Sequence, residues 1–122
     1  MGQPGHRGCM VGNNSASILV DAYLKGVRVE DVETLYKGLI HGTEAVHPEV
    51  SSTGRLGYEY YNKLGYVPCD VKIHENAART LEYAYDDWCI YQLAKEWNVQ
   101  EGNRIFVQAC HELQELLIRK AR

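Results

Sequence analysis

The chain has 122 residues, a length that suits one domain able to bury a core without disulfides or a structural metal. Hydrophobic residues make up 45% and charged residues 24%, with a formal net charge of -3. The sequence has no basic block, so it does not indicate binding to nucleic acid. It has no apolar run near 18 residues, so no membrane span is expected, and residues 1–7 lack the apolar core of a secretory signal peptide.

Four cysteines, Cys9, Cys69, Cys89 and Cys110, are widely spaced along the chain. No CxxC or HxxxH pair accompanies them, so the spacing typical of zinc sites is missing and no metal ligand is assigned. We expect these residues to be scattered buried thiols, because free cysteines usually pack as small apolar side chains.

The first part of the chain predicts two helices. Ser15 is expected to cap a helix that runs through residues 16–25, and Gly26 to end it. A second helix is predicted from about Val29, with acidic residues in its first turn and Gly42 at its end. The apolar residues of this second helix recur at helical spacing and are Val32, Leu35, Tyr36, Leu39 and Ile40.

The middle of the chain predicts a long loop and a short helix. Residues 43–57 have turn chemistry, and the loop exceeds the roughly 2–8 residues usual between helices, so it is expected to carry function or to pack against another part of the protein. A short helix is expected over 58–64, ended by Gly65, with an extended segment after it.

The strongest predicted helix spans about 75–97. One apolar stripe of this helix consists of Ala77, Leu81, Ala84, Trp88 and Tyr91, and four further apolar residues widen it, namely Ile90, Leu93, Ala94 and Trp97. A last amphipathic helix is predicted over about 105–121, with an apolar face of Ile105, Phe106, Ala109, Cys110, Leu113, Leu116 and Leu117. No stretch alternates at period two, so the predicted class is all-α.

Acidic and aromatic residues cluster at 82–88. Carboxylates beside aromatic rings suit carbohydrate chemistry, since acids handle protons and rings stack on sugars. Adjacent residues of a helix point about 100° apart, however, so Asp86 and Asp87 cannot flank one bond. The alternative is that Glu82 and Asp86 share one face as a solvated pair or as ion-pair partners of Arg79.

Two further groups are candidates by residue type. Asn13 and Asn14 precede the first predicted helix, where amides and free N–H groups can hold sugar hydroxyls or simply cap the helix. His74 and Glu75 could bind a metal or act in acid–base catalysis, but stabilisation of a first helical turn by Glu75 is the interpretation we favour.

Three segments resemble the glycoside hydrolase family 92 α-mannosidases. Residues 52–68 include STGRLG and YYNKLGYVP, residues 79–95 include RTLEYAYDDWCI and LAK, and residues 9–26 include CMVG and DAYLKG. The resemblance implies a fragment of an (α/α)6 toroid, within a larger periplasmic or secreted enzyme. It also implies calcium-dependent, inverting hydrolysis of terminal α-linked mannose, with mannose-containing glycans as partners.

The residues that would perform catalysis are expected outside this chain. The family's general acid lies in an EGN motif well downstream of the YDDWC helix, and its base lies further on. Glu101 also begins EGN, but it lies too close to Trp88, so no catalytic residue is assigned here. We therefore expect the fragment to be inactive alone and to bind no calcium itself. By residue type and motif, Asn13, Asn14, Asp86, Asp87 and Trp88 are expected nearest the sugar.

The sequence predicts two regions, a partial catalytic domain over 1–103 and a divergent amphipathic tail over 104–122. Read in another frame with permitted codons, residues 106–115 can give LCKRAMNYKN, which resembles the family, so we hypothesise a frameshift that resequencing of the gene would test. The alternative function is a non-catalytic helical interaction or scaffold module. If the chain is an excerpt of a larger domain, self-association through exposed apolar helix faces is expected, whereas a cooperative melt of a soluble monomer would favour the free-standing module.

Overall fold

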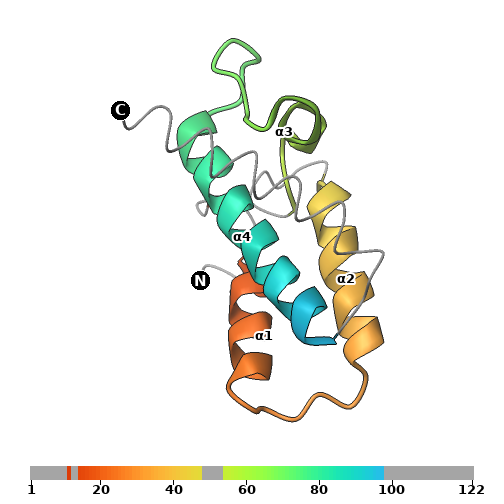
Figure 1. Ribbon diagram of the computed structural model, residues 1–122. Coiled ribbons are helices and arrows are strands. Elements are labelled where there is room, and N and C mark those ends of the chain that lie inside the picture. Colours follow the sequence, from red (N-terminus) through yellow and green to blue (C-terminus); the bar gives the residue numbers. More distant parts are fainter. Residues whose placement is uncertain (1–10, 12–13, 48–53, 98–122) are drawn as a thin grey trace, which may run out of the picture.

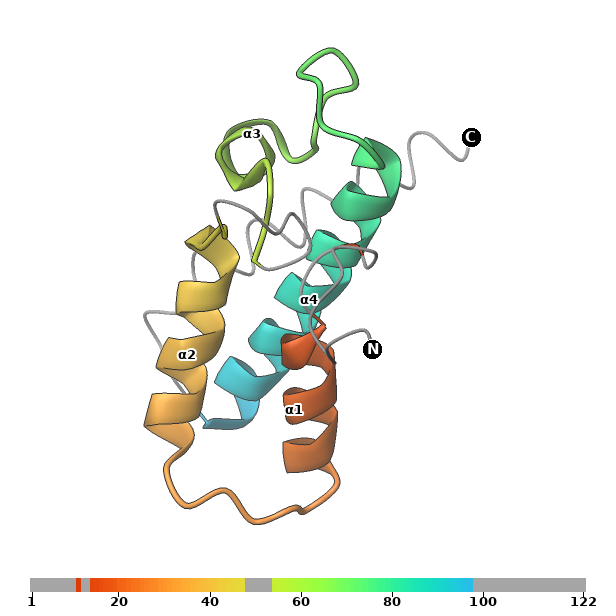
Figure 2. The same ribbon diagram turned by 180° about the vertical axis from the view of Figure 1, so that it is seen from behind.

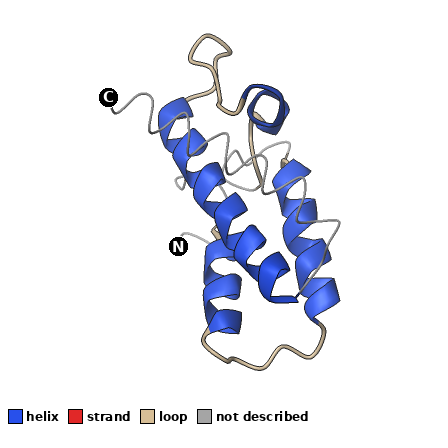
Figure 3. Cartoon of the chain, in the orientation of Figure 1, coloured by secondary structure: helices blue, strands red, loops and turns tan. Residues whose placement is uncertain are grey.

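The computed structural model describes residue 11 and residues 14–47 and 54–97. These residues form four helices and no strand (Figure 3), namely α1 (Ser15–Leu24), α2 (Val32–Glu44), α3 (Tyr58–Leu64) and α4 (Asn76–Trp97). A loop joins α1 and α2 at one end, and α4 packs against both of them (Figure 1). Seen from behind, α3 lies beyond the end of α2, which it contacts (Figure 2). The predicted all-α class is confirmed for the described residues.

The start of α1 differs from the prediction by one residue. Asn14, not Ser15, is the N-cap, and its side chain makes no capping hydrogen bond. The reason is that the Asn14 carbonyl already accepts the Ile18 N–H at 3.2 Å, which makes Ser15 the first helical residue. The predicted end is confirmed, since Gly26 has a φ of 87° and its N–H bonds to the Tyr23 carbonyl.

The bounds of α2 lie later than predicted. The helix does not begin near Val29, because Asp31 caps it by accepting hydrogen bonds from the Thr34 N–H at 2.9 Å and the Thr34 hydroxyl at 2.6 Å. Gly42 does not end it either. The last turn continues because its buried residue Thr43 donates to a carbonyl within the helix. The bounds of α3 and its end before Gly65 are as predicted.

The described core consists of two apolar clusters. The larger one joins α1, α2 and α4 and contains Ala16, Val20, Tyr36, Leu39, Cys89, Ile90, Leu93 and Ala94. The smaller one joins α3, the following loop and α4, and contains Tyr61, Val67 and Tyr83. The apolar stripe predicted on α2 therefore faces the core, as expected of an amphipathic helix.

Only part of the apolar face predicted on α4 is buried: Ile90, Leu93 and Ala94 lie in the core, but the stripe that they were expected to widen does not. Leu81 and Trp88, both on that stripe, are 52% and 49% exposed, whereas Arg79, Asp86 and Asp87 are buried. The apolar spacing of the helix could not predict that its aspartates are buried. Their charges are compensated by a residue from a distant loop, and a hydrophobic pattern contains no information on that contact.

The cysteine prediction holds in part. Cys89 is buried, as expected, but Cys69 is exposed, because it lies in the loop between α3 and α4. Cys9 and Cys110 lie outside the described residues, as do the predicted helix over 105–121 and the proposed tail over 104–122. Among the helices that the structure describes, none is long and apolar enough to span a membrane.

Candidate functional site

The candidate site is a group of charged and phenolic side chains enclosed between α4 and the loop before α3. We call it the buried charge cluster, and its members are Arg55, Tyr61, Tyr83, Asp86 and Asp87. Arg55 Nη2 lies 2.6 Å from Asp87 Oδ1, and the Tyr61 hydroxyl donates to Asp87 Oδ2 at 3.1 Å. The three charged residues are at most 3% exposed. Ions so far from water persist only where pairing and hydrogen bonds offset the lost hydration.

The two tyrosines of the cluster enclose the guanidinium group. Arg55 Cζ lies 5.3 Å from the Tyr83 ring centroid and 5.8 Å from that of Tyr61, within the range of cation–π attraction. The rings meet edge to face, with centroids 5.5 Å apart. The Tyr83 hydroxyl donates to the Leu56 carbonyl at 2.9 Å, which ties α4 to the loop that carries Arg55. The guanidinium is therefore held on several sides.

A glycine brings Arg55 into place. Gly54 has a φ of 78°, and it forms an antiparallel bridge with Val46. The Arg55 N–H then donates to the Ala45 carbonyl at 2.8 Å. A Cβ on Gly54 would lie 1.8 Å from the Ala45 oxygen, closer than any real contact. Only glycine permits this approach of the two backbones, so the loop conformation that places Arg55 beside Asp87 depends on Gly54.

Asp86 faces a small cavity between α1, α2, the loop and α4. The cavity has a volume of about 10 Å³, and Ser15, Thr43 and Arg55 also line it. A space of this size has room for about one water molecule. Asp86 Oδ1 is buried and has no hydrogen-bond partner within the described part of the chain. The adjacent residue Asp87 differs from Asp86, because the charge of its Oδ1 is compensated by the ion pair with Arg55.

The environment of Asp86 favours its protonated form. Burial is the main cause, and together with the charges of Asp87 and Glu82 it raises the pKa of Asp86 to about 7, against the opposing effect of Arg55. Burial also raises the pKa of Asp87, where Arg55 and the Tyr61 hydroxyl oppose it. The cluster can therefore hold or release a proton at Asp86 near neutral pH.

This shift predicts a pH dependence of stability. Because the folded pKa of Asp86 lies above its model value of 3.8, the folded state binds more protons than the unfolded state between these values. The free energy of unfolding should therefore fall as pH rises from about 4 to about 7, by at most about 1.4 kcal/mol per pH unit. Urea unfolding of Asp86→Asn should lack this component, and equal pH slopes in the two proteins would contradict the assignment.

The structure separates the residues predicted to lie nearest the sugar. Asp86 and Asp87 are buried within the cluster, whereas Trp88 is half-exposed and stacks on Tyr85 with ring centroids 6.1 Å apart. Asn14 immediately precedes Ser15, which lines the same cavity as Asp86, so the start of α1 and the middle of α4 do come together. Asn13 lies outside the described residues. Contact of these residues with a sugar stays a prediction.

Two of the alternative interpretations are wrong. Glu82 and Asp86 are not a solvated pair, and Asp86 is not the partner of Arg79, because Asp86 turns into the core beside Arg55. Arg79 instead lies 3.8 Å from Glu75, and its Nε donates to the His74 carbonyl at 2.9 Å. Glu75 precedes α4, so it is not a first-turn residue.

Sequence reasoning missed the cation of the cluster. In the sequence, Arg55 stands out only as part of a motif, and no local pattern marks the two tyrosines that enclose it. The available signal was the Gly54–Arg55 pair after a long loop, since a buried acidic pair on a helix needs a cation from elsewhere. Periodicity could not reveal this, because Arg55 and Asp87 lie 32 positions apart in the sequence.

The arrangement belongs to the class of (α/α) toroid folds. A solved structure of a family GH92 inverting mannosidase from Bacteroides thetaiotaomicron matches it with a TM-score of 0.83 and 49% sequence identity. The match covers 91% of this chain and 15% of that chain.

Residues 2–118 match the model of the glycosyl hydrolase family 92 catalytic domain, and the chain belongs to this family. A curated relative, described as an uncharacterized secreted glycosidase from Arthroderma benhamiae, is 28% identical over 92 residues. These cover 69% of this chain and 12% of that protein. The chain thus spans a small part of the length of each of these two proteins.

Proposed function

We propose that this chain contributes part of the catalytic domain of an enzyme that hydrolyses terminal α-linked mannose with inversion. The observation that carries the proposal is the 49% identity to an inverting mannosidase at a TM-score of 0.83. The family match over residues 2–118 supports it. The substrates would accordingly be mannose-containing glycans, and a periplasmic or secreted location fits the relative that is described as secreted.

Within that enzyme, the buried charge cluster would set the shape of the sugar site. Arg55 and Asp87 hold the loop against α4, and Asp86 offers an oxygen that no described residue satisfies. We propose Asp86, with Asn13, Asn14, Asp87 and Trp88, as the residues nearest the sugar. The two aspartates do not form the catalytic pair, because an inverting enzyme needs carboxyl groups about 6.5–9.5 Å apart around a water, and Asp87 is committed to Arg55.

Calcium is assigned no step. The described residues contain no group of three or more His, Cys, Asp or Glu side chains that could hold a metal ion. Calcium prefers six to eight oxygen ligands, and the buried Asp86 and Asp87 are accompanied by a cation, Arg55, rather than by further acids. The described part of the chain therefore does not fit a calcium site. A calcium ion that serves this reaction would be bound by residues elsewhere in the protein.

A chimera tests the proposed function. We expect the Bacteroides mannosidase to remain active when residues 54–97 of this chain replace its own matching segment, and the isolated chain to release no mannose with or without calcium. Asp86→Asn in the chimera should lower kcat/KM for an α-mannoside by up to about 10-fold, the effect of one weakened hydrogen bond from a neutral group.

The matched control in the chimera is Glu59→Gln, at an exposed position of α3, which should leave kcat/KM unchanged. Circular dichroism and thermal unfolding must show that each chimera is folded. A folded chimera without activity would contradict the proposed function, and full activity of Asp86→Asn would remove Asp86 from the sugar site. Mannose release by the isolated chain would show that the chain needs no further residues.

One observation favours a second function, that of a non-catalytic helical interaction module. Ile18, Leu19 and Leu24 of α1 are 67%, 42% and 49% exposed, and exposed apolar side chains are common contact points for other proteins. Such a module would act by binding another protein through these exposed side chains. Thermal unfolding together with sedimentation velocity separates the two functions, since a free-standing module should melt cooperatively as a soluble monomer, whereas an excerpt of a larger domain should aggregate or oligomerise.

A further inference from the structure

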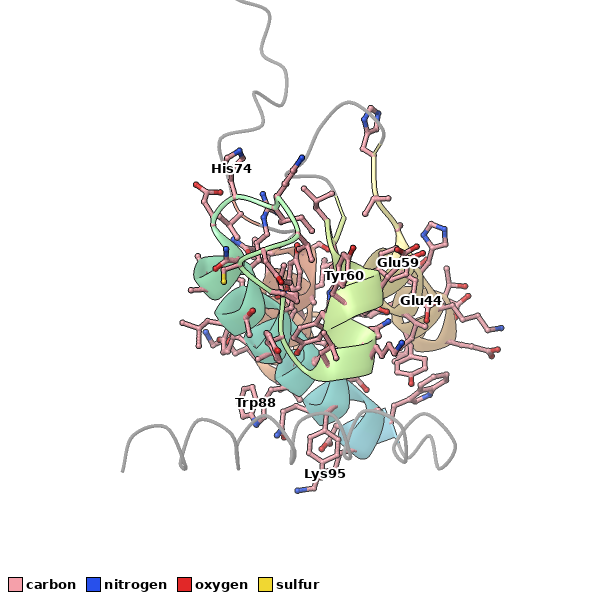
Figure 4. All side chains as sticks on the ribbon, turned by 90° about the horizontal axis from the view of Figure 1, so that it is seen from above. Glu44, Glu59, Tyr60, His74, Trp88 and Lys95 are labelled. Atoms are coloured by element: carbon pink, nitrogen blue, oxygen red, sulfur yellow. The ribbon has the colours of Figure 1, made fainter. Side chains whose placement is uncertain are left out.

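The cavity beside Asp86 lies on the inner side of α4. Asp86 and Trp88 are two residues apart, about 200° around the helix, so their side chains leave α4 on opposite sides. Trp88 and Lys95 project outwards from α4, away from α3 (Figure 4). Asp86 therefore points between α4 and the two helices packed against it, α1 and α2. Most of the residues that line the cavity are themselves buried, so the core encloses it.

We propose that this cavity is a binding site for one ordered water molecule, which bonds to Asp86 Oδ1 and joins α4 to α2 and α1. The cavity volume of about 10 Å³ admits a single water. Asp86 Oδ1 is buried, and no described residue forms a hydrogen bond with it. A carboxyl oxygen enclosed in this way loses its hydration without compensation, and a bound water removes that penalty.

The lining supplies the further partners that a buried water needs, which usually number two to four. Thr43 of α2 donates its hydroxyl proton to the Ile40 carbonyl at 2.7 Å, so its oxygen can still accept a hydrogen bond from the water. Ser15 of α1 lines the same space. The water would thus connect three helices through their polar side chains. This inference does not rest on the proposed function, because it uses only residues of the described part of the chain.

Water suits Asp86 in both of its protonation states. An ionised carboxyl group only accepts hydrogen bonds, whereas a protonated one can also donate. A water molecule can turn to meet either arrangement, because it is both a donor and an acceptor. We therefore expect the site to be occupied on both sides of the pH at which Asp86 titrates.

Two other states of the cavity fit its lining less well. A cation would lie near the guanidinium of Arg55, which lines the same cavity and carries a like charge. The described residues also contain no group of three or more His, Cys, Asp or Glu side chains that could hold a metal ion. A dry cavity is expected where the lining is apolar. This lining instead includes four polar or charged residues, namely Ser15, Thr43, Arg55 and Asp86.

Oxygen-17 magnetic relaxation dispersion on the full chain is the first test, since it detects long-lived waters and is not affected by exchanging hydroxyl protons. We expect Asp86→Leu to lower the dispersion amplitude per chain by the contribution of one water, because leucine removes the partner oxygen and fills the space. The matched control Glu96→Leu replaces an exposed carboxylate of the same helix and should leave the amplitude unchanged. Equal amplitudes in Asp86→Leu and the unmodified chain would overturn the proposal.

A crystal structure of the unmodified chain tests the site without any substitution. We expect density for one water at about 2.5–3.0 Å from Asp86 Oδ1. A cavity without density, or a carboxyl group turned to a protein partner, would overturn the proposal. Sodium chloride and choline chloride at equal ionic strength should give the same midpoint of thermal unfolding. A higher midpoint in sodium chloride would overturn the proposal by assigning the site to a cation.

Discussion

Replacing Arg55 with methionine is expected to destabilise the fold by about 3–5 kcal/mol, because it leaves a carboxylate buried without its cation. Arg55 Nη2 lies 2.6 Å from Asp87 Oδ1, and both side chains are almost fully enclosed. Asp86 faces the same guanidinium from the cavity, so it loses its favourable charge as well. The midpoint of urea unfolding, measured with an unchanged slope, reports this loss.

Two further variants serve as controls for the effect of Arg55→Met. Lys37→Met breaks the ion pair with Glu33, which is exposed on α2, and should cost less than about 1 kcal/mol. The double variant of Arg55→Met with Asp87→Leu should recover part of the loss, since it removes both members of the buried pair. If Arg55→Met costs no more than Lys37→Met, the cluster is not the compensated ion pair that its geometry indicates.

Gly54→Ala is expected to lower the free energy of unfolding by at least about 3 kcal/mol. Two effects combine at this position. A side chain is strained at a φ of 78°, and the new Cβ would lie 1.8 Å from the Ala45 oxygen, so the backbone itself would have to move. The movement would break the hydrogen bond from the Arg55 N–H and withdraw the guanidinium from Asp87.

The chain offers a matched control for this variant. Gly38 lies within α2, and a Cβ there would meet no atom within 4 Å. Gly38→Ala should therefore stabilise the protein by about 0.5–1 kcal/mol, since alanine has the higher helix propensity. Thermal or urea unfolding of the two variants should give shifts of opposite sign. A loss at Gly54 no larger than about 1 kcal/mol would show that the loop can reach Asp87 by another path.

Local signals predicted most of the elements correctly. The end of α1 at Gly26, the bounds of α3 and the extent of α4 followed from glycine stops and apolar spacing, which act between neighbours in sequence. The errors at the start of α1 and at both ends of α2 concern single turns. There, competing hydrogen bonds such as those from Thr34 to Asp31 decide the boundary.

The family resemblance could also be recognised from the sequence, because it rests on long motifs that occur in the right order. The match over residues 2–118 and the 49% identity to the solved mannosidase confirm that reading. The acidic pair Asp86–Asp87 was selected on residue type. Its burial was not predicted, because two charges in a helix ordinarily indicate a solvated face.

What the sequence determined by itself is the set of helices and the family, since both depend on residue type and short-range spacing. What only the tertiary structure decided is which face of α4 is buried and what the acidic pair contacts. Arg55 reaches Asp87 across the fold because Gly54 lets the loop approach Ala45. Burial of a charge depends on a partner that the local pattern does not contain, so this contact could not be read from periodicity.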